Sequence, residues 1–429
     1  MYTVYKLASY FFAPLLLLHL GWRSLREAEY RRRWRERFAL SLEAMTPGGI
    51  VLHAASVGEV NAATPLVLAL LSRYPGLPLS LTCFTPTGSA RIRAVFGAQV
   101  QHAYIPLDLP GCVQRFFRHT RPRLLIIMET EIWPNLYHAA AQHNIPILLA
   151  NARISEKSFP RFQRVRRLVG DALLQVSCIT AQSENDARRF AALGAEPARI
   201  TVSGNLKFES KLPPALHMQG QALRRAWGEQ RPVFLAASTR EGEESPVLEA
   251  FQGVLKHFPT ALLILVPRHP ERFPQAVQLA RASGLSVHLL SAGLPCPASA
   301  QCLVVDAMGE LLRFYAACDV AFVGGSLVAV GGHNMLEPAA LSVPVLLGPH
   351  TFNFADISRE LLAAGGAKQV LNAAQLEHCV CELLGDAALR HRMGSAGLTL
   401  VAQGQGALVR ILEITDRLLA DGRSASLMQ

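Results

Sequence analysis

Two motifs in the first half of the chain place polar side chains directly after predicted apolar strands. Residues 53–59 read HAASVGE and bring Ser56, Gly58 and Glu59 to the expected start of a helix. Backbone N–H groups at a helix start favour an anion or a hydroxyl. Glu59 therefore fits either a general base or a first-turn acid stabilised by the helix dipole. G-x-S-x-G is absent, which argues against Ser56 as a hydrolase nucleophile.

The second motif, METEIWP at 128–134, puts Glu131 at a strand end beside a tryptophan. Paired acids in such a place suit general acid–base catalysis or the binding of sugar hydroxyls. A first-turn acid at a helix start fits the same pattern. Further on, Lys207 follows another strand in SGNLKF (203–208), either as a partner for a phosphate or carboxylate or as a solvated loop lysine.

Basic and glycine-rich loops follow strands in the second half. Arg268 and His269 stand in VPRHPERF (266–273). A guanidinium group at a strand end can grip a phosphate or a carboxylate with two hydrogen bonds. His269 fits either a general acid or a structural histidine.

The stretch 324–338 is the most informative, because two glycine pairs flank a short loop that leads into HNMLEP. Paired glycines, including Gly325 before Ser326, let the backbone approach a ligand, and the helix start at Asn334 favours an anion. Glu337 suits a ribose diol. G-x-G-x-x-G, the P-loop and HExxH are all absent, and no His/Cys/Asp cluster has metal-ligand spacing, so we predict no metal site.

The elements that carry these motifs follow one local plan used twice. Residues 49–88 and 232–271 each run from an apolar strand through Ala-Ala-Ser, a glycine-acid loop, a helix and a proline to another apolar strand. Continuous apolar strands that alternate with helices indicate a buried parallel sheet. We therefore predict two doubly wound α/β domains, 49–210 and 221–429, that face a central cleft, where we place the chemistry.

The N-terminal segment is apolar and is followed by arginines. Residues 7–22 read LASYFFAPLLLLHLGW, and seven arginines lie between Arg23 and Arg37. Extended back to Tyr2, the apolar run approaches the length that spans a bilayer, and an aromatic residue followed by basic ones is typical of a cytoplasmic membrane face. We predict a membrane-anchor helix over 1–22 and a basic juxtamembrane helix over 23–48. An interfacial amphipathic helix and a core helix also fit the apolar run.

Composition excludes several classes of protein. Of the 429 residues 50% are hydrophobic and 17% are charged, which excludes a mainly disordered chain and a long coiled coil. The net charge of +10 comes partly from the arginine stretch, and no aromatic stacking platform accompanies it, so we expect no nucleic-acid partner. The eight cysteines form no CxxC pair, and we predict that they are reduced thiols.

Taken together, the motifs resemble the 3-deoxy-D-manno-octulosonic acid (Kdo) transferase family of lipopolysaccharide biosynthesis. The shared stretches extend over residues 49–356 and include HAASVGE, TPTGSAR, METEIWPNL, NARIS, STREGEES, VPRHPERF, AFVGGSL, GGHNMLEPAA and GPHTFNF. Asn205 and Met335 depart from residues common in the family, and neither change removes a charged group.

The resemblance implies a GT-B fold of two Rossmann-like domains. It implies inverting transfer of Kdo from CMP-Kdo to the lipid A precursor lipid IVA, at the cytoplasmic face of the inner membrane, without cofactor or metal. It makes Glu59 the general base, with Ser56, Gly58, Glu131 and Lys207 at the substrates. It assigns the nucleotide to a larger set of residues: Arg268, His269, Met308, Gly309, Gly325, Ser326, Asn334 and Glu337.

Two other functions remain open on the sequence. One is a GT-B enzyme that uses a UDP-sugar with a lipid acceptor. The other is a membrane-associated binding protein that keeps the fold without catalysis. The sequence fixes neither the number of Kdo units added nor the oligomeric state.

Overall fold

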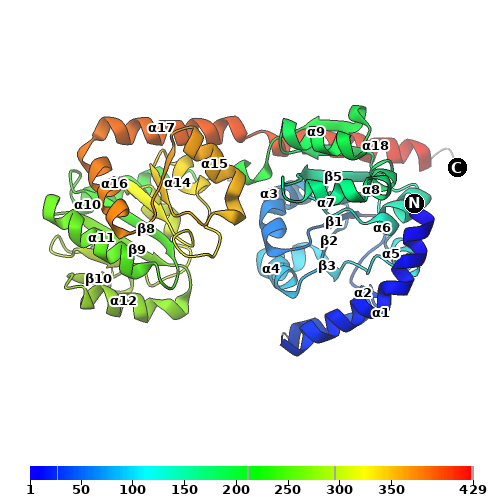
Figure 1. Cartoon of the computed structure of the whole chain (residues 1–429), viewed down its shortest axis with the longest axis horizontal. Helices are drawn as coiled ribbons and strands as arrows, with labels where there is room; N and C mark the ends of the chain where they lie inside the picture. The colour runs from blue at the N-terminus through cyan, green and yellow to red at the C-terminus, as the bar shows by residue number, and fades with distance from the viewer. Residues whose placement is uncertain (27, 210–211, 294–295, 427–429) are drawn as a thin grey trace. The chain divides into compact units, whose positions relative to one another are not determined.

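The computed structural model describes residues 1–26, 28–209, 212–293 and 296–426. The chain divides into two compact units. Unit 1 comprises Met1–Glu209 and Gly404–Gln429, and unit 2 comprises Ser210–Gln403. Within the described residues each unit contains a seven-stranded parallel sheet (Figure 1). This confirms the prediction of two doubly wound α/β domains.

The sheet of unit 1 has the order β3-β2-β1-β4-β5-β6-β7, so the strand order reverses between the neighbours β1 and β4. Most strands are buried along their whole length, because helices cover both faces and the sequence supplies continuous apolar runs. The strands are β1 (Ile50–His53), β2 (Leu79–Cys83), β3 (Gln101–Tyr104), β4 (Leu124–Met128), β5 (Ile147–Ala152), β6 (Cys178–Ala181) and β7 (Ile200–Val202). The main helices are α3 (Val57–Arg73), α4 (Pro86–Phe96), α5 (Pro110–Thr120), α6 (Pro134–Gln142), α7 (Phe159–Arg164), α8 (Arg166–Leu173) and α9 (Glu184–Leu193).

The sheet of unit 2 has the order β10-β11-β9-β8-β12-β13-β14, and its order reverses between β8 and β12. Ligands of open parallel sheets bind outside the carboxyl ends of the strands at such a reversal. The strands are β8 (Val233–Thr239), β9 (Leu262–Pro267), β10 (Val287–Leu289), β11 (Cys302–Val304), β12 (Val320–Val323), β13 (Val345–Leu347) and β14 (Ala367–Gln369). The helices are α10 (Leu216–Trp227), α11 (Glu244–His257), α12 (Phe273–Ala282), α13 (Leu311–Tyr315), α14 (Leu336–Ala340), α15 (Ala355–Ala363), α16 (Ala373–Gly385) and α17 (Ala387–Gly404).

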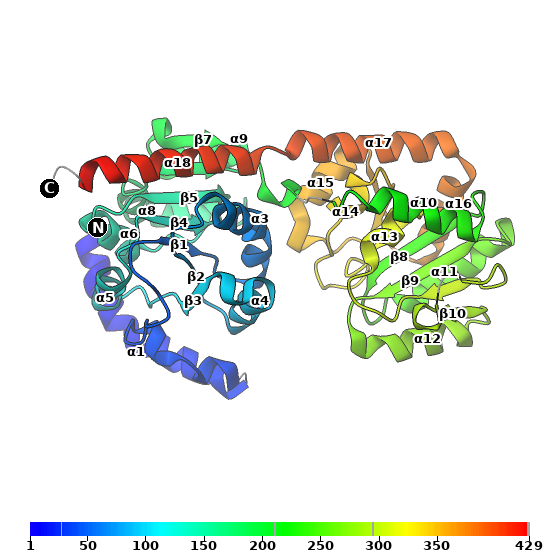
Figure 2. The same cartoon turned by 180° about the vertical axis from the view of Figure 1, so that it is seen from behind.

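The C-terminal helix α18 (Ala407–Ser426) belongs to unit 1, whereas the sequence analysis assigned all of 221–429 to the second domain. Its buried side chains Ala407, Ile411 and Ile414 share one hydrophobic core with Ile50 and Leu52 of β1. Figure 2 shows α18 lying along unit 1. The spacing of apolar residues in α18 predicts an amphipathic helix but not which sheet it covers, so the sequence could not place it.

Helix α1 (Tyr2–Arg26) is long and apolar enough to cross a membrane, by length and composition. One side of it contacts unit 1: the Tyr5 hydroxyl donates to Asp108 Oδ2 at 2.8 Å, and the ring of Tyr2 stacks on His138. The large apolar side chains exposed along one side of it include Val4, Leu7, Phe11, Leu15, Leu18, Trp22 and Leu25. Helix α1 therefore has one face docked on the protein and one apolar face left exposed.

The described residues of 23–48 do not form the single basic helix that the sequence predicted. Helix α1 ends at Arg26, a 3-10 turn covers Ala28–Arg31, and α2 is limited to Trp34–Arg37. Arg37 is 1% exposed; its guanidinium group stacks 4.2 Å from the ring centroid of Tyr104 and donates to the Phe84 carbonyl. Arginine is suited to this role because its planar group packs on aromatic rings. Part of the arginine stretch thus stabilises the fold instead of facing a membrane.

Candidate functional site

The loop after β1 holds Glu59 in a capping box at the start of α3. Ser56 is the N-cap, and its hydroxyl donates to Glu59 Oε1 at 3.0 Å while it accepts from the Glu59 N–H at 3.4 Å. Glu59 Oε2 accepts the N–H of Ala55 at 2.8 Å. This pattern is a variant of the capping box, because the carboxylate accepts the N–H of the residue before the N-cap, and it accounts for the S-x-x-E spacing. Glu59 is therefore a first-turn acid, as one interpretation of the motif expected, and Gly58 beside it is exposed.

Glu59 is also the most perturbed carboxyl group at this edge of the sheet. Burial, reinforced by the negative charges of Glu131 and Glu129, raises the pKa of Glu59 to about 8. A carboxyl group that titrates near physiological pH can accept and return a proton in a reaction. Its structural role in the capping box fixes its orientation, so the two interpretations of Glu59 are compatible.

Glu131 lies in the loop after β4, the strand adjacent to β1 across the reversal of strand order. Trp133 Nε1 donates to Glu131 Oε2 at 2.8 Å, and the buried Tyr137 hydroxyl donates to the Glu131 carbonyl at 2.9 Å. Helix α6 begins at Pro134, so Glu131 is not a first-turn acid. Burial and the charge of Glu129, which has a left-handed φ of 55°, raise the pKa of Glu131.

Lys207 lies in the 3-10 turn Leu206–Glu209 that follows β7, and this turn packs against α3. The turn is fixed by Asn151, whose Oδ1 accepts the Leu206 N–H at 2.9 Å, and by Asn205, whose Oδ1 accepts the Lys207 N–H at 3.0 Å. The carboxyl edge of the sheet in unit 1 thus carries two carboxyl groups with raised pKa, and Lys207 lies in a turn that packs against α3. That set suits deprotonation of a hydroxyl and contact with an anionic substrate.

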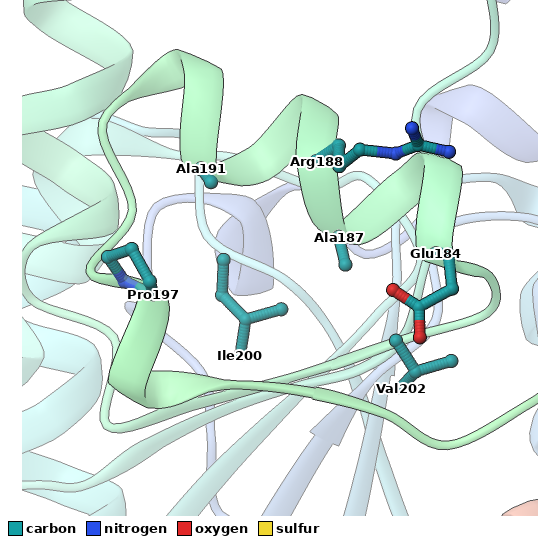
Figure 3. A pocket seen from close by; sticks show the side chains of 7 residues that line it. All are labelled: Glu184, Ala187, Arg188, Ala191, Pro197, Ile200 and Val202. Carbon is teal, nitrogen blue, oxygen red and sulfur yellow. The ribbon is translucent and has the colours of Figure 1, made fainter.

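One cavity of unit 1 lies away from this carboxyl edge. It has a volume of about 400 Å³ and lies between α9 and β7, with Glu184 and Arg188 at its rim (Figure 3). Its remaining lining is aliphatic, from Ala187, Ala191, Pro197 and neighbouring residues. It includes none of the predicted site residues.

In unit 2 two arginines follow the neighbouring strands β8 and β9. Arg268 follows β9, as the sequence predicts, and its backbone N–H donates to the Thr239 carbonyl at 3.0 Å. Arg240 follows β8, and its guanidinium group hydrogen-bonds to Nε2 of His269. Partial burial and the charge of Arg240 lower the pKa of His269, so this ring is neutral and accepts from Arg240.

Arg240 belongs to the STREGEES motif but is not among the site residues predicted from the sequence. The signal was available: the repeated plan puts residues 240 and 268 at equivalent ends of adjacent parallel strands. His333 lies in the same electrostatic field, because burial and the charges of Arg268 and Arg240 lower its pKa to about 4. The positive charge of this region therefore resides on the two guanidinium groups, which suit a phosphate or a carboxylate.

Asn334 and Glu337 come together as predicted. Asn334 Nδ2 donates to Glu337 Oε1 at 3.0 Å, and Asn334 Oδ1 accepts the Leu336 N–H at 3.1 Å. Burial raises the pKa of Glu337, opposed by Asn334 and Arg268. Helix α14 has only five residues, so its dipole is small, and an anion here depends on arginine more than on the helix start.

Gly325 and Ser326 follow β12, but the polar groups of Ser326 are used within the protein. Its hydroxyl donates to the Val323 carbonyl at 2.5 Å and accepts the Gly348 N–H at 2.8 Å, and its own N–H donates to the Glu243 carboxylate. Met308 and Gly309, after β11, are exposed. Among the described residues no group of three His, Cys, Asp or Glu is arranged to hold a metal ion.

Comparison with known proteins gives consistent matches. A family model described as 3-deoxy-D-manno-octulosonic-acid transferase (kdotransferase) matches residues 32–210. The Kdo transferase of Haemophilus influenzae is 41% identical over 94% of this chain and 95% of its own length. That of Bordetella pertussis is 39% identical over 96% and 97%. A glycosyltransferase structure from Rickettsia africae has a TM-score of 0.53 at 13% identity, over 87% of this chain and 99% of its own, which supports the fold alone.

Proposed function

Because the chain belongs to the Kdo transferase family and is therefore a glycosyltransferase of lipopolysaccharide biosynthesis, we propose that its donor is CMP-Kdo and its acceptor lipid IVA. In the proposed reaction an acceptor hydroxyl oxygen attacks the anomeric carbon of Kdo. The bond from that carbon to the phosphate oxygen breaks, and CMP leaves with the electron pair. Attack from the face opposite the leaving group inverts the anomeric configuration.

The observation that carries this proposal is the carboxyl group of Glu59, held in a capping box with a pKa raised to about 8. Glu59 takes the proton of the attacking hydroxyl as general base. The carboxylate of Glu131, oriented by Trp133, and the ammonium group of Lys207 contact the substrates in unit 1. The Ser56 hydroxyl donates to the Glu59 carboxyl group, and Gly58 precedes Glu59 in the first turn of α3.

In unit 2 the donor is bound through its phosphate and its nucleoside. Arg268, together with Arg240, neutralises the phosphate as it leaves. Glu337, oriented by Asn334, accepts from the ribose hydroxyls, and the exposed loop at Met308 and Gly309 lies near the cytosine. A single phosphate carries less charge than a diphosphate, so we expect activity to persist after incubation with EDTA.

The exposed apolar face of α1 supports attachment to the cytoplasmic face of the inner membrane. Phe11 is 77% exposed and Leu15 is 59% exposed on a helix whose opposite side contacts the protein. Large apolar side chains in such an arrangement insert among acyl chains. Lipid IVA resides in a bilayer, so this attachment brings the enzyme to its acceptor.

The test is mass spectrometry of lipid IVA after incubation with CMP-Kdo and the protein. We expect a mass increase of one or more Kdo units with the wild type and none with Glu59→Gln. Glu184→Gln, an exposed acid of the same unit, is the matched control and retains activity. No product from folded wild type, with product from a UDP-sugar instead, would replace the donor assignment. Equal product from Glu59→Gln would remove Glu59 from the role of base.

A further inference from the structure

Glu243 is a completely buried residue whose carboxylate accepts hydrogen bonds from backbone N–H groups. It directly precedes α11 and is 0% exposed. Its Oε2 accepts the N–H of Gly325 at 2.6 Å and of Arg240 at 2.9 Å; its Oε1 accepts the N–H of Ser326 at 3.0 Å and of Leu327 at 2.8 Å. Among the described residues no Lys or Arg side chain is paired with it. Four N–H donors satisfy the buried charge.

The three consecutive N–H groups of residues 325–327 form a concave anion-binding nest. Gly325 has a φ of 68°, the left-handed conformation that points successive N–H groups toward one spot. The nest lies after β12, at the reversal of strand order, where α/β proteins commonly bind phosphate groups. In this protein the carboxylate of Glu243 already occupies it.

The neighbouring Gly324 leaves the space that the Glu243 carboxylate needs beside the nest. A Cβ atom at residue 324 would lie 2.6 Å from the Ser238 carbonyl oxygen and 2.9 Å from Glu243 Oε2. Both distances are below any ordinary contact, so a side chain at residue 324 would displace the carboxylate. Gly324 therefore leaves room for the Glu243 carboxylate, whereas the left-handed conformation of Gly325 turns the N–H groups of the nest toward it.

We propose that Glu243 is a positioning residue: an internal anion that fills the nest after β12 and leaves the donor's phosphate to the guanidinium groups of Arg240 and Arg268. The proposal rests on the function proposed above. Glu243 Oε2 bridges Arg240, after β8, and Gly325, after β12, so one oxygen atom fixes both loops. The Gly325 carbonyl in turn accepts the Gly332 N–H at 2.6 Å, which extends the connection to the loop before Asn334.

A specificity consequence follows from the charge that fills the nest. A second phosphate that approached residues 325–327 would meet a carboxylate in place of free N–H donors. A donor with one phosphate avoids this repulsion, whereas a diphosphate donor does not. Glu243 thus favours a nucleoside monophosphate sugar over a nucleoside diphosphate sugar.

The experiment compares wild type, Glu243→Ala and Glu243→Gln with the control Glu244→Ala. Glu244 is adjacent and 1% exposed, but its carboxylate pairs with Arg272 and accepts from the Thr239 hydroxyl instead of from the N–H groups of residues 325–327. We measure KM for CMP-Kdo, kcat, inhibition by CMP and by CDP, and the melting temperature. Each measurement is made in sodium formate and in sodium chloride at equal ionic strength, because formate is a free carboxylate that fits the vacated nest.

We expect Glu243→Ala to raise KM for CMP-Kdo about 10-fold, which corresponds to about 1.4 kcal/mol. Formate should recover part of this loss and raise the melting temperature of this variant alone. The preference for CMP over CDP should fall in Glu243→Ala and in the near-isosteric Glu243→Gln. Glu244→Ala should lower the melting temperature without changing KM more than about twofold or responding to formate.

The proposal is overturned if both Glu243 variants keep the wild-type KM and CMP preference, or if formate acts equally on all variants. The formate-dependent melting temperature needs no turnover. If the wild type failed to use CMP-Kdo, the proposed function would fall, while filling of the nest by Glu243 would still be tested.

Discussion

Replacing Glu131 by Gln should shift the acid limb of the pH–rate profile toward lower pH. A general base acts in its deprotonated form, so log kcat/KM should rise with pH until the pKa of Glu59, about 8, and then level off. Burial is the largest cause of that raised pKa, and the negative charge of Glu131 is the second. Gln removes the charge and keeps an oxygen that can accept from Trp133.

The size of the shift can be estimated from the fold. Glu59 and Glu131 follow adjacent strands, which lie about 5 Å apart, and we take a separation of roughly 6–10 Å between their carboxyl groups as the basis of the estimate. At an effective dielectric constant near 20, two such charges repel by about 2–3 kcal/mol before screening by water. One pKa unit corresponds to about 1.4 kcal/mol. We therefore expect the limb to move down by about 1 unit.

The assay is initial-rate CMP release at limiting CMP-Kdo between pH 5.5 and 9.5, with lipid IVA in detergent. Glu131 also contacts substrate in our proposal, so the plateau of the variant should fall. The position of the limb is independent of the plateau height and reports the charge effect alone. Glu184→Gln should leave the limb unchanged. An unmoved limb in Glu131→Gln, or a limb moved to higher pH, would refute the electrostatic coupling of the two carboxyl groups.

Other expectations concern both units and the anchor. Because the pKa of Glu59 is raised, the wild type should lose stability as pH rises from about 4.5 to 8. Glu59→Gln lacks this titration, so calorimetry should show its melting temperature rising relative to that of the wild type between pH 5 and 9. Arg268→Ala should raise KM for CMP-Kdo about 10–100-fold, and Arg268→Lys should recover only part of it, since Lys lacks the two-pronged grip. Ile411→Ala should lower the free energy of unfolding, measured by urea denaturation, by about 2–5 kcal/mol, because the Ile411 side chain is fully buried. Changing Phe11 and Leu15 together to Ser should reduce co-flotation with anionic vesicles and leave the melting temperature unchanged.

Much of the fold could be predicted from the sequence because local signals agree with it. Continuous apolar runs predicted the buried parallel strands, and glycine or proline after them marked the carboxyl edges of the two sheets, where Glu59 lies in unit 1 and Arg268 lies in unit 2. The spacing of residues around Glu59 does not by itself predict its raised pKa. The S-x-x-E pattern predicts a capping box, but the carboxyl groups that raise its pKa come from a loop about seventy residues away.

The features that could not be predicted depend on tertiary contacts. Arg37 appeared as one more basic residue near a membrane, yet aromatic rings from β3 and the loop after β2 enclose it. Ser326 appeared to be a ligand residue, but its hydroxyl bonds to Val323 and Gly348. Such partners are set by which strands become neighbours, and a single segment of sequence does not contain that information.

The return of α18 to unit 1 has a consequence for biosynthesis. A ribosome makes the chain from the N-terminus, so all strands of unit 1 and the whole of unit 2 emerge before Ala407 does. Until then Ile50 and Leu52 lack part of the apolar cover that Ile411 and Ile414 provide. Unit 2 can finish folding during synthesis, whereas unit 1 is completed only after translation has passed α18. The unit that carries Glu59 is thus completed last, and loss of helix α18 would expose the part of its core that includes Ile50 and Leu52.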